Sequence, residues 1–432
     1  MHIRIKGARV LDPGNIDGKK DIIIKDNLIK AIVDPEDIVS DVDFKTADCK
    51  TIDACNMIVV PGLIDIHVHL REPGYEYKET IETGLTAAAK GGFTAVCSMP
   101  NTNPVNDNGV TTKFIINRAR ELKLSRVYPT GAITSGSMGE TLAKIDEMKQ
   151  AGIVAVTDDG MPVENSDLMQ RALEYCKDID IPIFVHAEEL SLVNGGSMNE
   201  GEVSTSYGIK GIPNTAESVM VIRDITLAEQ TDSKVHFCHI STHESIEAIR
   251  QAKKRGVKVS CETAPHYFTL IDEDIKDYNT NFKMNPPLRF RKDREAVITG
   301  LKDGTIDLIA SDHAPHSIED KDVQFDKAPF GIVGLETSLS LSSKLVQDKV
   351  LTMEELIIKM SKNPAKIIGL NNDIKPGNVA DLTIIDPEMS YEIDPANFES
   401  KSKNTPFAGF NVKGGVFLTM VNGKIIYQRS EI

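Results

Sequence analysis

Histidine and aspartate residues recur along this chain where short apolar, strand-like runs end. The first group is His67-Val68-His69, which follows the run at 62–66. Single residues follow later segments rich in β-branched side chains: Asp159, His186, His239 and Asp312. Neutral imidazoles and carboxylates together are ligands that suit Zn²⁺ and similar divalent ions. Because a bound divalent ion can activate water, the pattern predicts a metal-dependent hydrolase.

The two histidines of the first group are separated by one residue, so in a strand both side chains point to the same face. His67 and His69 can therefore chelate one ion, although a pair of hydrogen-bonded surface histidines is the alternative. His186 or His239 alone would be read as an ordinary buried histidine. The combination with the other strand-end residues favours metal binding, whereas nothing groups His236 and His243 with them.

The two aspartate positions invite different predictions. Asp312 could merely cap the next helix, but it is followed by HAPH at 313–316, which favours a ligand that also transfers protons. Asp158-Asp159-Gly160 could be a solvated loop. One of its carboxylates could instead bridge two ions, since a bridge needs an anionic group with two oxygens.

The elements that must position these residues alternate between strand and helix patterns. Eight strands are predicted at 63–69, 93–99, 126–131, 153–158, 182–187, 234–239, 257–262 and 306–311. Helices are predicted at 79–90, 141–151, 166–177 and 216–229. Ligands at the carboxyl ends of several parallel strands are typical of a (β/α)₈ barrel. The predicted fold is an α/β, TIM-like barrel over 59–370.

Both ends of the chain instead show short strands and hairpin turns. Asp26-Asn27 separates two strand-like runs, and Asn422-Gly423 is a type I′ hairpin signal. We expect residues 1–58 and 371–432 to form one small composite β-sandwich domain. Two separate β extensions are the alternative.

Bulk properties exclude several classes of partner. The 432 residues carry a net charge of −15, which argues against a nucleic-acid partner. No apolar run approaches the ~18 residues that span a bilayer, and the N-terminus lacks the apolar core of a signal peptide. The six cysteines form no Cys-x-x-Cys pair, so reduced thiols and a cytoplasmic location are expected. Cys261, near the predicted active face, is either buried packing or a reactive thiol.

Four segments resemble those of dihydroorotases in the amidohydrolase superfamily, and in the family's order. They are PGLIDIHVHLREPG at 61–74, MPNT at 99–102, MNPPLR at 284–289 and ASDHAPH at 310–316. The resemblance covers most of the chain and includes the composite β-sandwich domain formed by its two ends. It implies the reversible hydrolysis of (S)-dihydroorotate to N-carbamoyl-L-aspartate, in de novo pyrimidine (UMP) biosynthesis.

The resemblance also implies a ligand set. His67, His69 and Asp312 would hold one ion, His186 and His239 would hold a second, and Asp159 would bridge them. Many members of the superfamily bridge with a carbamylated lysine. This strand end offers no lysine, as in bacterial and archaeal dihydroorotases with aspartate there. The implied cofactor is Zn²⁺, with two ions per subunit favoured over one.

Arg71 is the main indication of substrate. It lies two residues beyond His69, so its side chain would face the same end of the predicted barrel. There its guanidinium could bind the ring carboxylate of dihydroorotate through two hydrogen bonds. A surface arginine on a loop is the alternative. The resemblance implies further substrate contacts at His69, Asn101, Asn285, His316, Phe330 and Gly331, where the last two could also be an ordinary turn.

The expected mechanism is attack of a metal-activated hydroxide on the ring amide, with Asp312 moving the proton to the departing nitrogen. Hydantoinases, dihydropyrimidinases and allantoinases remain an alternative. They share the fold, but usually carry the bridging lysine and lack an arginine at the position of Arg71. A non-catalytic, metal-free scaffold is a third reading, although such relatives usually lose ligands.

The partner expected from this reading is a small molecule, dihydroorotate or N-carbamoyl-L-aspartate. Two assemblies stay open. One is a homodimer, the commonest symmetric oligomer. The other is association with an aspartate transcarbamoylase, which would supply the carbamoyl aspartate.

Overall fold

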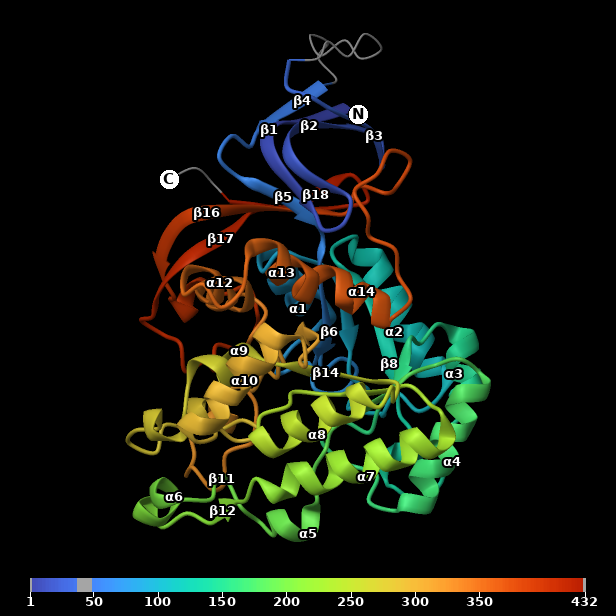
Figure 1. Cartoon of the computed structure of the whole chain (residues 1–432), viewed down its shortest axis with the longest axis vertical. Helices are drawn as coiled ribbons and strands as arrows, with labels where there is room; N and C mark the ends of the chain where they lie inside the picture. The colour runs from blue at the N-terminus through green and yellow to red at the C-terminus, as the bar shows by residue number, and fades with distance from the viewer. Residues whose placement is uncertain (1, 37–48, 430–432) are drawn as a thin grey trace.

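A computed structural model describes residues 2–36 and 49–429, which form two large sheets and the helices around them (Figure 1). The first sheet has eight parallel strands in the order β15-β14-β13-β10-β9-β8-β7-β6. They are β6 (Leu63–Val68), β7 (Phe93–Ser98), β8 (Arg126–Gly131), β9 (Ala155–Val156), β10 (Ile183–Val185), β13 (Val235–Phe237), β14 (Val259–Thr263) and β15 (Leu308–Ile309). Every strand predicted for the barrel is present, and several are shorter than predicted.

The two edge strands of this sheet meet through the segment that follows β15. Val68, at the end of β6, forms a parallel bridge with His313. The backbone N–H of His69 donates to the carbonyl of His313 at 2.8 Å. These contacts nearly close the sheet, which confirms the predicted barrel. They also bring the predicted ligands that follow β6 close to the one that follows β15.

Helices connect the strands and cover the barrel (Figure 1). The longer ones are α1 (Ile81–Lys90), α2 (Gly109–Leu122), α3 (Ile145–Ala151), α4 (Ser166–Asp178), α7 (Thr215–Thr231), α8 (His243–Lys254), α10 (Arg291–Asp303) and α12 (Ser338–Gln347). Thr80 caps α1 by accepting from the N–H of Thr83, and Gly91 is its C-cap, so the helix ends at residue 90 as predicted. Asn108 caps α2 by accepting from the next turn.

Shorter elements fill the connections between the barrel units. They are β11 (Met198–Asn199), β12 (Gly211–Ile212), α5 (Leu190–Val193), α6 (Glu202–Tyr207), α9 (Pro265–Thr269), α11 (Ile318–Lys321), α13 (Met353–Ile357) and α14 (Asn363–Ile367). Within the described ranges, no helix combines the length and the apolar character that crossing a membrane requires.

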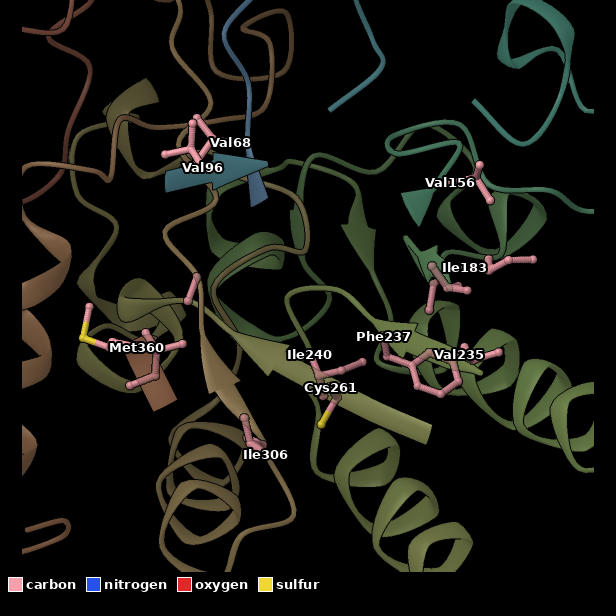
Figure 2. Close-up of a cluster of buried hydrophobic side chains, with 14 of the residues drawn as sticks. Val68, Val96, Val156, Ile183, Val235, Phe237, Ile240, Cys261, Ile306 and Met360 are labelled. Carbon is pink, nitrogen blue, oxygen red and sulfur yellow. The ribbon is translucent and has the colours of Figure 1, made fainter. Parts of the chain in front are cut away.

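Apolar side chains of the strands and helices form the core that fixes the strand ends. Figure 2 shows part of this cluster, with residues from β6, β7, β9, β10, β13 and β14. Phe237 and Ile183 are fully buried there. Burying such a side chain stabilises a fold by roughly 1.5–3 kcal/mol, so this cluster stabilises the scaffold beneath the predicted ligands.

The second sheet joins the two ends of the chain, with blue and red strands side by side at the top of Figure 1. Its strands are β1 (His2–Asp12), β2 (Ile16–Lys25), β3 (Leu28–Val33), β4 (Cys49–Asp53), β5 (Ile58–Pro61), β16 (Leu382–Glu392), β17 (Asn411–Val421) and β18 (Lys424–Gln428). The antiparallel pairing of β5 with β16 links the two ends.

This sheet has a hydrophobic cluster of its own, which includes Ile5, Ile22, Leu382 and Leu418. Asn422 and Gly423 both have positive φ, 53° and 69°, as the predicted type I′ turn requires. On this basis we propose the predicted division, with residues 1–58 plus 371–432 as one domain and 59–370 as the other, although β5 continues the second sheet to Pro61, past the predicted boundary. Residues 37–48, within the N-terminal range 1–58, lie outside the described part of the chain.

Candidate metal centre and substrate pocket

The six predicted ligands lie at the carboxyl ends of the barrel strands, where the fold brings them together. His67 belongs to β6 and His186 directly follows β10. The other four lie in the loops after β6, β9, β13 and β15: His69, Asp159, His239 and Asp312. All six are buried, none more than 6% exposed, so the cluster is shielded from bulk water.

Asp159 lies at the centre of the cluster. Its Oδ1 is 3.4 Å from His67 Nε2, 3.6 Å from His186 Nδ1 and 3.7 Å from His239 Nε2. Its Oδ2 is 3.5 Å from His69 Nε2. One carboxylate thus faces four imidazole nitrogens, the arrangement expected of a bridging ligand.

Asp312 faces the first histidine pair. Its Oδ1 lies 3.6 Å from His67 Nε2 and 3.4 Å from His69 Nε2. These three residues form a compact group within ligand reach of one another, and a second group contains His67, Asp159 and His239. Two groups that share a histidine beside a central carboxylate are consistent with one or two ions.

The residues fit a divalent cation on two observations. Ligand atoms at about 2.1 Å from a tetrahedral Zn²⁺ lie about 3.4 Å from one another, close to the separations around Asp159. His67 Nε2 and Asp159 Oδ1 are also buried without a hydrogen-bond partner. Leaving such atoms unpaired is costly, and a cation between them would remove that cost. His186 Nδ1 and His239 Nε2, at 2.9 Å, share a hydrogen bond that a common ion would replace.

Three of the histidines are oriented by a partner on the ring nitrogen that faces away from Asp159. His67 Nδ1 donates to Glu262 Oε1 at 2.7 Å, and His69 Nδ1 donates to Asn101 Oδ1 at 2.9 Å. His186 Nε2 donates to Glu188 Oε2 at 3.1 Å. Because these partners are acceptors, each ring keeps a lone pair on the nitrogen that faces the cluster, as metal-binding histidines require.

The neighbouring histidines keep the carboxylates of the cluster ionised. Burial alone would raise the pKa of Asp312, but the imidazoles of His69, His67 and His239 lower it to about 2. Burial likewise opposes ionisation of Asp159, yet the neighbouring imidazoles of His67, His186 and His239 hold its pKa well below the ordinary value. Both carboxylates are therefore anionic at neutral pH and can hold a cation or accept a proton.

Three residues of the site have left-handed backbone conformations. The φ angles are 61° for Arg71, 34° for His239 and 48° for Asp312. Side chains other than glycine rarely adopt this region, and such strain is commonly found at functional sites. The surrounding barrel evidently holds these residues in place.

The predicted carboxylate-binding residues lie together beside the cluster. Arg71 Nε donates to the carbonyl of Pro315 at 3.3 Å, and its NH2 group is 3.5 Å from His316 Nε2. His316 Nε2 in turn donates to the carbonyl of Phe330 at 2.8 Å. A Cβ on Gly331, whose φ is 129°, would lie 2.7 Å from the carbonyl of Ala314, so this position requires glycine.

Much of the hydrogen-bonding capacity around the pocket is already engaged. Asn101 Nδ2 donates to Asp159 at 3.4 Å, and Asn285 Nδ2 donates to Glu188 at 3.0 Å. The N–H and carbonyl of Gly331 are bonded to Lys283 and Asn404. A ligand that used Asn101 or Gly331 would therefore have to replace these hydrogen bonds.

Sequence reasoning missed the residues that orient the predicted ligands. Glu188 lies only two residues beyond His186, and Glu262 lies in β14, two residues after Ser260. His236 is a buried, hydrogen-bonded histidine, as predicted, and its partners are Glu262 and Ser260. Buried polar residues in strands, aligned with the ligand-bearing strand ends, are the signal that could have identified them.

The cysteine prediction is resolved in favour of packing. The five cysteines whose side chains are described are free, and only Cys55 is exposed. Burial raises the pKa of Cys261 to about 12, which makes it an unreactive thiol. The side chain of Cys49 lies outside the described part of the chain.

Solved structures with the same architecture include L-hydantoinase from Arthrobacter aurescens, which superposes with a TM-score of 0.88 at 27% identity. That match covers 100% of this chain and 97% of the hydantoinase. Dihydropyrimidinase from Brevibacillus agri matches with a TM-score of 0.81 at 21% identity, covering 99% and 95%, which shows the fold alone. Together with the strand-end cluster, this fold defines the class of the chain as a cyclic amidohydrolase.

Sequence relatives specify the family within that class. A family model described as dihydro-orotase-like matches residues 56–245. The dihydroorotase of Desulforapulum autotrophicum is 61% identical over 99% of this chain and all of its own length. That of Geobacter metallireducens is 53% identical with the same coverage. The chain belongs to the dihydroorotase family, which confirms the resemblance found in its motifs.

Proposed function

We propose that this chain catalyses the reversible hydrolysis of (S)-dihydroorotate to N-carbamoyl-L-aspartate in pyrimidine biosynthesis. The observation that carries the proposal is the position of Arg71: its guanidinium approaches His316 and lies near enough to the cluster to interact with the charges of Asp159 and Asp312. A cyclic amide with a ring carboxylate needs both parts of such a site. The full-length relatives named dihydroorotase support the same substrate.

The cofactor we propose is Zn²⁺, with two ions per subunit. His67, His69 and Asp312 would hold the first ion, His186 and His239 the second, and Asp159 would bridge them. When bound, such ions lower the pKa of a water molecule and polarise the amide carbonyl. The nitrogen-rich ligand set with carboxylates suits zinc better than the oxygen-only sites that magnesium and calcium prefer.

Asp312 is the residue we propose to move the proton. Its carboxylate is ionised at neutral pH, because its pKa is lowered to about 2 by neighbouring histidines once burial is offset. It can accept the proton of the attacking water as a general base. It can then deliver that proton to the ring nitrogen as the C–N bond breaks, and in ring closure the steps run in reverse.

Arg71 is the residue we propose to bind the ring carboxylate. Burial lowers the pKa of the guanidinium, but an arginine stays charged across the physiological range. His316 would contact the same carboxylate, and His69, Asn101, Asn285 and the backbone of Phe330-Gly331 would contact the ring. This end of the pocket would distinguish dihydroorotate from hydantoin or dihydrouracil, which lack the carboxylate.

A substrate panel tests this assignment. Purified, metal-loaded enzyme is assayed with dihydroorotate, hydantoin, dihydrouracil and allantoin at equal concentrations. We expect kcat/KM for dihydroorotate to exceed that for each of the others by at least about 100-fold, since the carboxylate contacts are charge-assisted. Preferred turnover of hydantoin or allantoin would instead assign the hydantoinase-like function.

The proposal extends to the location and the assembly of the enzyme. The free cysteines fit a reducing compartment, so we propose a cytoplasmic enzyme. We also propose a homodimer and an association with an aspartate transcarbamoylase. Light scattering of the enzyme alone, and then with that transcarbamoylase, tests both: a monomer mass would reject the first, and no added mass would reject the second.

A further inference from the structure

Lys78 lies on the opposite side of His316 from Arg71. Its Nζ is 3.2 Å from His316 Nδ1, whereas Arg71 approaches Nε2 of the same ring at 3.5 Å. The Lys78 side chain is only 16% exposed. Its ammonium also lies 5.8 Å and 5.4 Å from the ring centroids of Tyr75 and Tyr77, which limits its freedom.

The two hydrogen bonds of His316 define which ring nitrogen carries the proton. The carbonyl of Phe330 can only accept, so Nε2 must donate to it. A lysine ammonium can only donate, so Nδ1 must be the unprotonated nitrogen that accepts from Lys78. Both nitrogens are satisfied by groups of opposite role, and the ring is locked in one neutral tautomer.

The surroundings of the ring also oppose a second proton. Burial, followed by the charges of Arg71, Lys78 and Lys321, lowers the pKa of His316 to about 2. The imidazole therefore stays neutral between two cationic side chains. Asp320, whose Oδ2 is 3.3 Å from Lys78 Nζ and 3.6 Å from His316 Nδ1, is the carboxylate that faces them.

The cations matter because the chain as a whole repels anions. Its net charge is −15, so local cations must favour an anionic group at the Arg71 end of the pocket. A carboxylate substrate must approach this region against that field. Partly buried cations act more strongly than exposed ones, since water screens them less.

We propose that Lys78 is a positioning and specificity residue for the substrate carboxylate: it fixes the His316 tautomer and adds a second positive charge behind Arg71. The inference rests on the proposed function, because the anion is taken to be the ring carboxylate of dihydroorotate. The lysine does not touch the reacting atoms. Its effect therefore belongs in substrate binding rather than in the chemical step.

Two variants at this position separate charge from side-chain packing. Lys78→Met keeps the aliphatic length and removes the charge and the donor, whereas Lys78→Arg keeps both. We expect Lys78→Met to raise KM for dihydroorotate at least tenfold and to change kcat less than threefold. Lys78→Arg should return KM to within threefold of the parent. The control is Lys327→Met, at a lysine whose side chain is 72% exposed, which should leave both constants unchanged.

The tautomer is measured without substrate. ¹⁵N spectra of histidine-labelled enzyme, with the His316 signals assigned by their loss in His316→Gln, report each ring nitrogen. The parent should show a protonated Nε2 and a hydrogen-bonded, unprotonated Nδ1. In Lys78→Met the Nδ1 resonance should move to that of an unbonded nitrogen.

The outcomes separate this inference from the proposed function. KM unchanged within twofold in Lys78→Met would overturn the role of Lys78. If Arg71→Ala still raises KM in the same assay, the assignment of the carboxylate end stands without it. An equal fall of kcat and kcat/KM in Lys78→Met, with no change in the His316 resonances, would also overturn the inference, because it would indicate only structural damage.

Discussion

Glu262 Oε1 lies 2.7 Å from Nδ1 of His67, inside the barrel and directly behind the candidate metal centre. The other carboxylate oxygen lies 3.1 Å from Nε2 of His236. Burial alone would raise the pKa of Glu262, but the hydrogen bonds of the two histidines lower it to about 2. An ionised acceptor therefore holds the His67 ring with its free nitrogen toward Asp159.

Replacing this carboxylate should weaken metal binding. Glu262→Gln has nearly the same shape but no charge, and outer-shell partners of metal-binding histidines typically contribute 10–100-fold to affinity. We expect the dissociation constant for zinc, measured by competition with a chelator, to rise at least tenfold. Glu336→Gln, at a buried glutamate that pairs with Lys90 away from the cluster, is the control. Equal zinc affinity in both variants would refute the orienting role.

Removing the proposed proton carrier should stop turnover. Asp312→Asn cannot accept the proton of the attacking water, and general acid–base groups typically contribute 10²–10⁴-fold to rate. We expect kcat to fall at least about 100-fold, with little change in the thermal midpoint. Metal content must be measured in the same preparation, since Asp312 is also a predicted ligand. A fully loaded variant with near-normal kcat would rule out the proton-transfer role.

Truncating the guanidinium should act on substrate binding. Charge-assisted hydrogen bonds contribute about 1.5–3 kcal/mol, so Arg71→Ala should raise KM for dihydroorotate by roughly 10- to 100-fold. Arg71→Lys keeps the charge but loses the planar fork, and should recover only part of the loss. Steady-state kinetics with both variants provide the test. If KM stays at the parent value in Arg71→Ala, another group binds the carboxylate.

The buried amine of Lys321 should make stability depend on pH. Burial, with the nearby charge of Lys283, lowers the pKa of Lys321 to about 7. The unfolded chain then binds more protons between about pH 7 and the ordinary lysine pKa of about 10.4, so this residue's contribution to stability rises with pH there. Its Nζ donates to the carbonyls of Pro329 and Lys283 at 2.8 and 3.1 Å, which the two hydrogens of a neutral amine satisfy.

Thermal unfolding of the parent and of Lys321→Met over pH 7–10 checks this dependence. The thermal midpoint of the parent should rise relative to that of the variant as the pH increases. Lys327→Met, at an exposed lysine in the segment that follows α11, should run parallel to the parent. A constant difference between parent and Lys321→Met would show that this amine does not titrate as argued.

Much of the fold could be predicted because strand and helix patterns alternate regularly between 63 and 311. The proximity of the predicted ligands could also be predicted from sequence, since residues at strand ends, such as His67 and Asp312, must converge in a closed barrel. The partners Glu262, Glu188 and Lys78 were not predicted. Their roles depend on which side chains face each other across the barrel, as with Lys78 and His316, which lie 238 positions apart. Four of the longer helices were not named in advance: Gly109–Leu122, His243–Lys254, Arg291–Asp303 and Ser338–Gln347. Asn108 does supply a capping signal for the first of them.

The most direct test of the central claim is dihydroorotate hydrolysis, followed by ultraviolet absorbance, in enzyme stripped with a chelator and then titrated with Zn²⁺. The account predicts no turnover in the stripped enzyme and activity that rises with added zinc up to two equivalents per subunit. Activity saturating at one equivalent would leave the catalytic claim intact and correct the count. Full turnover by stripped enzyme, or none by folded enzyme with zinc bound, would contradict the account.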